Sequence, residues 1–239
     1  MLSQTIFESW LNWTCNFADV RYISFDEQWT PGESDARWRQ QRTREMKCPA
    51  CRTVFSGPAP QCPTCKLSLL RLDAKFGVVP RHTRYLTDRS GRLPLREIKK
   101  LRALLQIFEK KFPQSLFSVF VTNGVPSGSI SEYAFWLANR TGFSSIQAVA
   151  GDNFDLLLGI DVETGIAALI IGYGLENYLT EDDLQAALAV AENAFRAGDF
   201  PRGIRECVEF VMSRMREIAR ASKAHKRVGN LAAAGVNNR

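Results

Sequence analysis

Apolar residues recur three or four positions apart in several stretches of the chain, the spacing of one face of an α-helix. One predicted helix begins near Pro94 and its apolar face runs from Leu95 to Phe108. Two more are predicted over 132–141 and 181–197, and a long one from Pro201 to about Ile218. Ser129 with Glu132 and Thr180 with Asp183 have the spacing of helix N-terminal capping pairs.

Shorter apolar runs between these helices are typical of buried strands. One is predicted over 116–122, and two more over 155–161 and 166–172, where a four-residue turn favours an antiparallel hairpin. Asp161, which opens that turn, is predicted to cap the hairpin. Because strands and helices alternate, the sequence predicts an α/β sandwich with a mixed sheet over 80–222, followed by a disordered basic tail over 223–239.

Apolar positions near the N-terminus also have helical spacing. The stripe of Ile6, Trp10, Trp13, Phe17 and Val20 predicts an amphipathic helix, within an N-terminal segment and basic connector over 1–45. We expect its apolar face to dock onto the protein itself or a sister subunit, and a membrane-surface role is the alternative. Cys15 and Cys207 lie on apolar helical patterns and are predicted to be buried thiols.

The chain contains 239 residues with 45% hydrophobic content, enough for one substantial core and a small module. The sequence shows no transmembrane segment and no secretory signal. A cytoplasmic location is therefore predicted. Six cysteines in a reducing compartment favour metal binding over a disulfide framework.

Four of the cysteines form the pattern C-x2-C-x10-C-x2-C within 46–70, namely Cys48, Cys51, Cys62 and Cys65. Four thiolates suit the tetrahedral coordination of Zn²⁺, so the pattern predicts a zinc ribbon. With four protein ligands no position is left for water or substrate, which makes the zinc structural rather than catalytic. A redox dithiol is the alternative, although it needs only one CxxC pair.

Charge is distributed unevenly along the chain. Residues 36–111 carry 19 basic and 5 acidic side chains, whereas residues 112–219 carry 6 and 14. The basic segment could contact nucleic acid, an acidic protein, or only solvent. Stacking on bases is weakly supported, since Phe55 is the one aromatic residue within the ribbon.

Several motifs occur in one order along the chain. They are YLTDRSGRLPL, SISEYAFWLANRTG, DNFDLLLGID, IAALIIGYGLE and FRAGDFPRGIRECVEFVMSRM. In this order they resemble the TPM domain family, from about Tyr85 to Ile218. The resemblance implies an α/β/α sandwich. The family includes a thylakoid-lumen protein of photosystem repair with a proposed acid phosphatase activity, an acetylcholine-receptor accessory subunit and bacterial envelope proteins.

The resemblance also implies candidate site residues. Asp88 and Asp152 would be catalytic in a phosphatase, and a Ca²⁺ or Mg²⁺ ion would be held by the carboxylates of Asp88, Asp152, Asp155 and Glu176. The simpler alternative is that these aspartates cap backbone N–H groups. Phe154 stands where the family has a glycine. The cations considered for binding phosphate are Arg84, Arg89 and Arg140.

Three functions follow from these features. The first is a binding or scaffolding protein that engages a protein partner, such as the cytosolic side of an envelope complex. The second is a divalent-metal-dependent phosphatase at the acidic loops. The third is nucleic-acid binding through the basic ribbon region.

Overall fold

The structure is a computed structural model that describes residues 15–17, 45–56, 59, 61–141, 154–176 and 178–236. Its central sheet has five strands in the order β1-β7-β6-β5-β4. Their bounds are β1 Cys15–Phe17, β4 Leu86–Asp88, β5 Phe117–Thr122, β6 Leu156–Asp161 and β7 Ile166–Gly172. Strands β4, β5 and β6 are parallel, β7 is antiparallel to β6, and β1 is parallel to β7. The predicted mixed sheet and the hairpin over 155–172 are confirmed.

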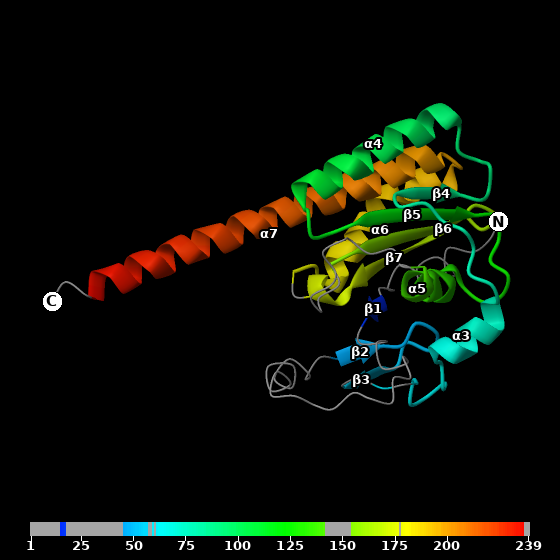
Figure 1. The fold of residues 1–239 in the computed structure, drawn as a ribbon, viewed down its shortest axis with the longest axis horizontal. Coiled ribbons are helices and arrows are strands. Elements are labelled where there is room, and N and C mark those ends of the chain that lie inside the picture. Colours follow the sequence, from blue (N-terminus) through cyan, green and yellow to red (C-terminus); the bar gives the residue numbers. More distant parts are fainter. Residues whose placement is uncertain are drawn as a thin grey trace.

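Helices cover both faces of this sheet (Figure 1). On one face lie α4 Leu95–Lys111, α6 Glu181–Arg196 and α7 Phe200–Val236, which share a core with alternate residues of the strands. On the other face lie α3 Leu69–Phe76 and α5 Ile130–Arg140. The predicted α/β/α sandwich is therefore confirmed.

The helix starts follow the predicted capping residues. Ser129 accepts the backbone N–H of Glu132 at the start of α5. At α6 the Thr180 and Asp183 side chains each accept the backbone N–H of the other residue, a reciprocal capping box. Both pairs satisfy donors that a helix N-terminus leaves unbonded.

A second, two-stranded sheet lies outside the sandwich. It pairs β2 Glu45–Lys47 with β3 Val54–Ser56 in antiparallel register, with Met46 and Phe55 as backbone partners. The predicted zinc-ribbon cysteines lie in the turn between these strands and in the segment that leads to α3. The ribbon is thus joined directly to a helix of the sandwich.

The N-terminal helix prediction is wrong where the structure tests it. Residues Cys15–Phe17 form strand β1, which pairs with Ile170–Gly172 of β7, because backbone pairing at the sheet edge competes with the helical pattern there. Cys15 therefore does not lie on a helix. The rest of the predicted helix, including Trp10 and Trp13, lies outside the described residues.

Helix α7 is longer than the sequence predicted. It continues to Val236, whereas the sequence predicted a helix ending near Ile218 and a disordered tail from 223. Ala is frequent in this extension, and the strong helix propensity of Ala favours continued helix. Figure 1 shows the C-terminal part of α7 projecting beyond the sandwich. No helix in the described part of the chain is long and apolar enough to cross a bilayer.

Candidate metal centre

Two short turns with the same hydrogen-bond pattern present the four cysteines. In the first, the N–H of Arg52 donates to the carbonyl of Cys48 at 3.0 Å, and the N–H of Cys48 donates to Thr53 at 3.0 Å. In the second, the N–H of Lys66 donates to Cys62 at 3.0 Å, and the N–H of Cys62 donates to Leu67 at 2.8 Å. Each C-x2-C sequence therefore folds into the same knuckle.

Each knuckle closes on a left-handed residue. Arg52 has φ 62° and Lys66 has φ 60°, and among the described residues they are the non-glycine residues with positive φ. This conformation costs an L-residue about 1–2 kcal/mol. The left-handed residue turns the chain after the second cysteine, and both cysteines of a pair point to the same side. Because this conformation is unfavourable by itself, its presence indicates that the surrounding structure requires it.

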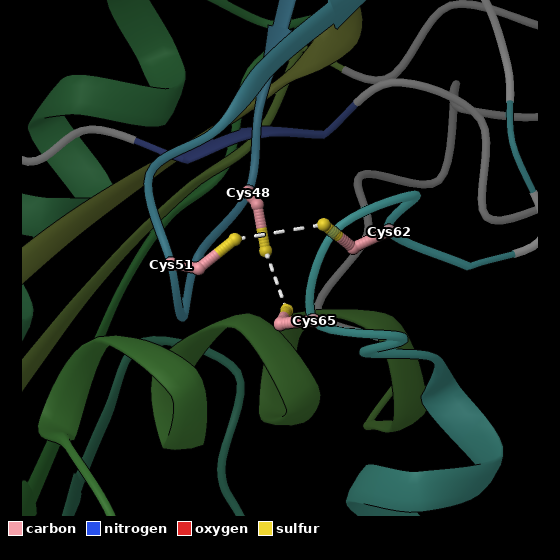
Figure 2. A group of neighbouring side chains, drawn as sticks. All are labelled: Cys48, Cys51, Cys62 and Cys65. Atoms are coloured by element: carbon pink, nitrogen blue, oxygen red, sulfur yellow. Dashed lines mark hydrogen bonds between the residues drawn. The ribbon is translucent and has the colours of Figure 1, made fainter.

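The four sulfur atoms converge on one point, with Cys48 facing Cys65 and Cys51 facing Cys62 (Figure 2). The Sγ–Sγ distances are 3.5 Å for Cys48–Cys65 and 3.6 Å for Cys51–Cys62, and all four atoms lie within 4.8 Å of one another. A tetrahedral Zn²⁺ with Zn–S bonds of about 2.3 Å requires sulfurs about 3.8 Å apart. The predicted cysteine set is therefore suited to a zinc ion.

The environment of the thiols is uneven. Cys48 and Cys62 are buried, and burial raises the pKa of the Cys48 thiol, whereas Cys51 lies at the surface. Although burial acts to raise it, hydrogen bonds with Thr53 and the neighbouring cysteines lower the pKa of Cys51 to about 6. Four thiols this close resist joint ionisation, because the negative thiolates would repel one another. A bound divalent cation removes that repulsion.

The cysteines are the one candidate metal-binding group among the described residues. Elsewhere in that part of the chain, no group of three or more His, Cys, Asp or Glu side chains is placed to hold a metal ion. Asp88, Asp155 and Glu176 are therefore not brought together. Asp152 lies outside the described residues, so its predicted role as a catalytic residue or cation ligand stays a prediction.

Sheet register explains why the three described carboxylates do not meet. Asp88 is the last residue of β4 and pairs with Val121 of β5, which in turn pairs with Ile160 of β6. Asp155 precedes the opposite end of β6, five residues from Ile160, or about 16 Å along the strand. Glu176 follows β7, which ends beside Asp155. The register therefore separates Asp88 from Asp155 and Glu176, and the cation site over Asp88, Asp152, Asp155 and Glu176 stays a prediction.

Asp88 itself has both carboxylate oxygens occupied. Oδ1 accepts the N–H of Ser90 at 2.8 Å, its hydroxyl at 2.6 Å and the N–H of Gly91 at 3.1 Å. Oδ2 accepts the N–H of Leu93 at 3.0 Å. These bonds hold the loop between β4 and α4, which is the capping alternative that the sequence left open.

Asp161 also caps the backbone, as predicted. Its Oδ1 accepts the N–H of Glu163 at 3.0 Å within the hairpin turn and the N–H of Gly124 at 2.9 Å from the neighbouring loop. The side chain is 2% exposed. Its carboxylate thus fixes the turn against the loop that follows β5.

Two of the three predicted phosphate-binding cations are engaged elsewhere. Arg84 pairs with Glu109 on α4, and Arg140 pairs with Asp73 on α3. Arg89 is exposed at the end of β4. The guanidinium groups of Arg84 and Arg140 are therefore held in different parts of the fold.

Sequence reasoning missed the helix that connects the metal centre to the sandwich. Ser68 accepts the N–H of Arg71 at 3.3 Å and caps α3, and Leu69, Leu72 and Phe76 form its buried side. The three-and-four spacing of these apolar residues was the signal available in the sequence. Helix α3 carries Arg71 and Asp73, which contact the ribbon and α5 respectively.

The chain is similar to a known domain family and to several solved structures. The sequence profile of the TPM domain matches residues 86–214. None of the curated proteins matches the chain significantly. Among solved structures, the N-terminal domain of a P. gingivalis protein is similar at 20% identity and TM-score 0.48, covering 63% of this chain and 88% of its own.

Two further solved structures are similar at lower scores. The N-terminal domain of the cg2496 protein from Corynebacterium glutamicum has 18% identity and TM-score 0.44, covering 56% of this chain and 82% of its own. The BA42 protein from Bizionia argentinensis has 12% identity and TM-score 0.44, covering 55% and 86%. The profile match spans more than half of the chain, and the chain therefore belongs to the TPM domain family.

Proposed function

We propose that this protein is a zinc-stabilised binding or scaffolding protein in which the ribbon and the TPM domain together engage a protein partner. The observation that carries the proposal is the convergence of four sulfur atoms within 4.8 Å. Four protein ligands fill a tetrahedral zinc shell, so the ion would have no open position for substrate. Such a site stabilises a surface rather than performing a reaction.

The ribbon has little apolar material of its own, which supports a structural role for the metal. Val54 is 51% exposed and Phe55 is only half-buried, and among the residues from 48 to 66 whose burial the structure describes, the buried ones are Cys48 and Cys62. Zinc binding would therefore supply much of the free energy that folds this module. The proposed function includes a cytosolic location, because a reducing compartment would keep the four thiols available for the metal.

The environment of Asp88 argues for the binding function over the phosphatase. A catalytic or metal-binding carboxylate faces the substrate or the cation, whereas Asp88 is turned to its own loop and accepts three hydrogen bonds at Oδ1 and one at Oδ2. Phosphoryl transfer also needs cations at the reacting group, yet Arg84 and Arg140 form ion pairs with Glu109 and Asp73. Neither Ca²⁺ nor Mg²⁺ is required by the proposed function.

Nucleic-acid binding is the weaker alternative for the basic ribbon region. A zinc ion with four thiolates carries a net charge of −2. Neighbouring cations such as Arg52 and Lys66 would offset this charge, so they do not by themselves indicate a nucleic-acid surface. Arg71 is already bonded to a backbone carbonyl of the ribbon. A nucleic-acid complex would show an affinity that falls steeply with salt.

The test compares partner binding with and without the metal centre. The full chain would be immobilised as the wild type and as the Cys51→Ser/Cys65→Ser variant, and bound proteins from its native cells would be quantified by mass spectrometry. The proposal predicts a stoichiometric protein partner that the variant loses. Hydrolysis of p-nitrophenyl phosphate with Mg²⁺ or Ca²⁺, abolished by both Asp88→Asn and Asp152→Asn, would instead establish the phosphatase.

A further inference from the structure

Helix α3 follows the second knuckle almost without a linker. Three residues separate Cys65 from Leu69, and the last of them, Ser68, is the N-cap of the helix. Arg71, in the first turn, donates from Nη1 to the backbone carbonyl of Cys65 at 2.8 Å. The start of α3 is therefore bonded to the same turn that presents a zinc ligand.

The other side of α3 is fixed to α5 by polar contacts. Asp73 accepts the indole N–H of Trp136 at 2.9 Å and the Nε–H of Arg140 at 2.9 Å. Lys75 forms an ion pair with Glu132 one turn away. Although burial acts to raise it, the bonds from Arg140 and Trp136 hold the pKa of Asp73 below its usual value, so the carboxylate is charged at neutral pH.

Apolar contacts complete the interface between α3 and α5. Leu72 and Trp136 are fully buried, and the Phe76 ring lies edge-on to Tyr133 with centroids 5.0 Å apart. An eight-residue helix is too short to be stable alone in water. Helix α3 therefore depends on both of its attachments, the knuckle at one end and α5 along its side.

We propose that α3 couples zinc occupancy to the α5 face of the TPM domain: zinc holds the Cys65 turn in the geometry that starts α3, and loss of the metal undocks α3 from Trp136. This inference rests on the zinc binding in the proposed function and adds the regulation of that site. Undocking would uncover the aromatic cluster of Phe76, Tyr133 and Trp136, so the surface offered to a partner would change with metal content.

Linkage makes the proposal quantitative. If zinc raises the equilibrium constant for docking of α3 by a given factor, a change that undocks α3 completely must lower the zinc affinity by that same factor. The Asp73→Asn variant is suited to this purpose, because it removes the charge that pairs with Arg140 while an amide oxygen can still accept the Trp136 N–H. Asp182→Asn on α6 is the matched control, since Asp182 is exposed on the opposite layer.

The experiment measures both sides of the linkage on the full chain. Hydrogen exchange of peptides from α5 would be compared before and after zinc removal, and zinc affinity would be measured by competition with a chelating indicator. Zinc removal should raise exchange in α5 roughly tenfold, with little change in α4 and α6. Asp73→Asn should weaken zinc binding by a measurable factor that does not exceed this one, because it loosens α3 without removing every contact with α5. Asp182→Asn should change neither quantity.

Three results would overturn the coupling in distinguishable ways. One zinc per chain with unchanged α5 exchange after its removal would contradict the role of α3 and leave the zinc site intact. A uniform rise of exchange through α4 and α6 would show global unfolding instead of local undocking. Absence of zinc binding in the wild type would contradict the coupling and the proposed function together.

Discussion

The carboxylate of Asp155 accepts the backbone N–H of Leu116 at 2.8 Å and thereby ties the start of β6 to the segment that enters β5. The backbone carbonyl of Asp155 also accepts the N–H of Gly172 at 2.6 Å, at the end of β7. The residue is 6% exposed. One aspartate therefore joins three neighbouring strands at the same edge of the sheet.

Replacing Asp155 should destabilise the fold. In Asp155→Ala the N–H of Leu116 would stay buried without this acceptor, which costs about 1–3 kcal/mol. Asp155→Asn keeps an acceptor oxygen and should lose less. Urea unfolding measures the change, with the exposed Asp182→Ala as control, and an unchanged midpoint in Asp155→Ala would contradict this structural role.

The loop before β6 packs against the loop after β7 through Phe154 and Gly174. A Cβ built on Gly174 would lie 2.8 Å from ring carbons of Phe154. The bulky side chain of Phe154 thus covers the glycine of the GYGLE motif directly. This contact restricts the size of the side chain that position 174 can accept.

A double-mutant cycle tests this contact. Gly174→Ala should cost about 1–3 kcal/mol in the wild type, because the added methyl group overlaps the Phe154 ring. In a Phe154→Ala background the same substitution should cost little, since the ring is gone. Equal costs in both backgrounds, measured by chemical denaturation, would mean that the two residues are not coupled.

Asp183 links the start of α6 to α7 and makes stability depend on pH. Its carboxylate accepts from the Thr180 N–H at 2.9 Å and from Arg214 Nε at 2.6 Å. Although burial acts to raise it, these bonds hold the pKa of Asp183 below the ordinary value of 3.8. The carboxylate therefore stabilises the fold at pH above 3.8, and this stabilisation is lost as the pH falls through the lower folded-state pKa.

The Asp183→Asn variant should show this pH dependence directly. At neutral pH it should unfold more easily than the wild type by about 1 kcal/mol, as for loss of an N-terminal capping interaction. The difference should shrink in acid, where the wild-type carboxyl is itself protonated. Thermal unfolding of both proteins across the acid range is the measurement, and a constant difference would refute the assignment.

Much of the sandwich could be predicted because its elements carry local signals. The capping pairs at Ser129 and Thr180 and the hairpin over 155–172 depend on neighbouring residues, and the structure contains all three. Strand β1 could not be predicted in this way. Its three residues are held by pairing with a strand more than 150 positions away, and the surrounding apolar spacing favoured a helix.

The sequence was sufficient to predict which cysteines form the metal centre. It was not sufficient to predict where the acidic residues lie relative to one another. The C-x2-C spacing alone indicates the knuckle, because each pair is completed within six residues. Whether Asp88 and Asp155 meet depends on strand order and register, which the sequence does not display. The resemblance to the family suggested one acidic site, whereas the sheet places the two aspartates at opposite ends of its strands.

The central claim is that the four cysteines hold one structural zinc ion. The most direct measurement is the metal content of the intact protein, purified without added metal, by mass spectrometry together with its thermal midpoint. We predict one zinc per chain, lost with a lower midpoint in Cys51→Ser/Cys65→Ser and retained in Cys207→Ala, whose thiol lies in the core away from the cluster. Protein without zinc, or zinc that survives loss of these two cysteines, would contradict the account.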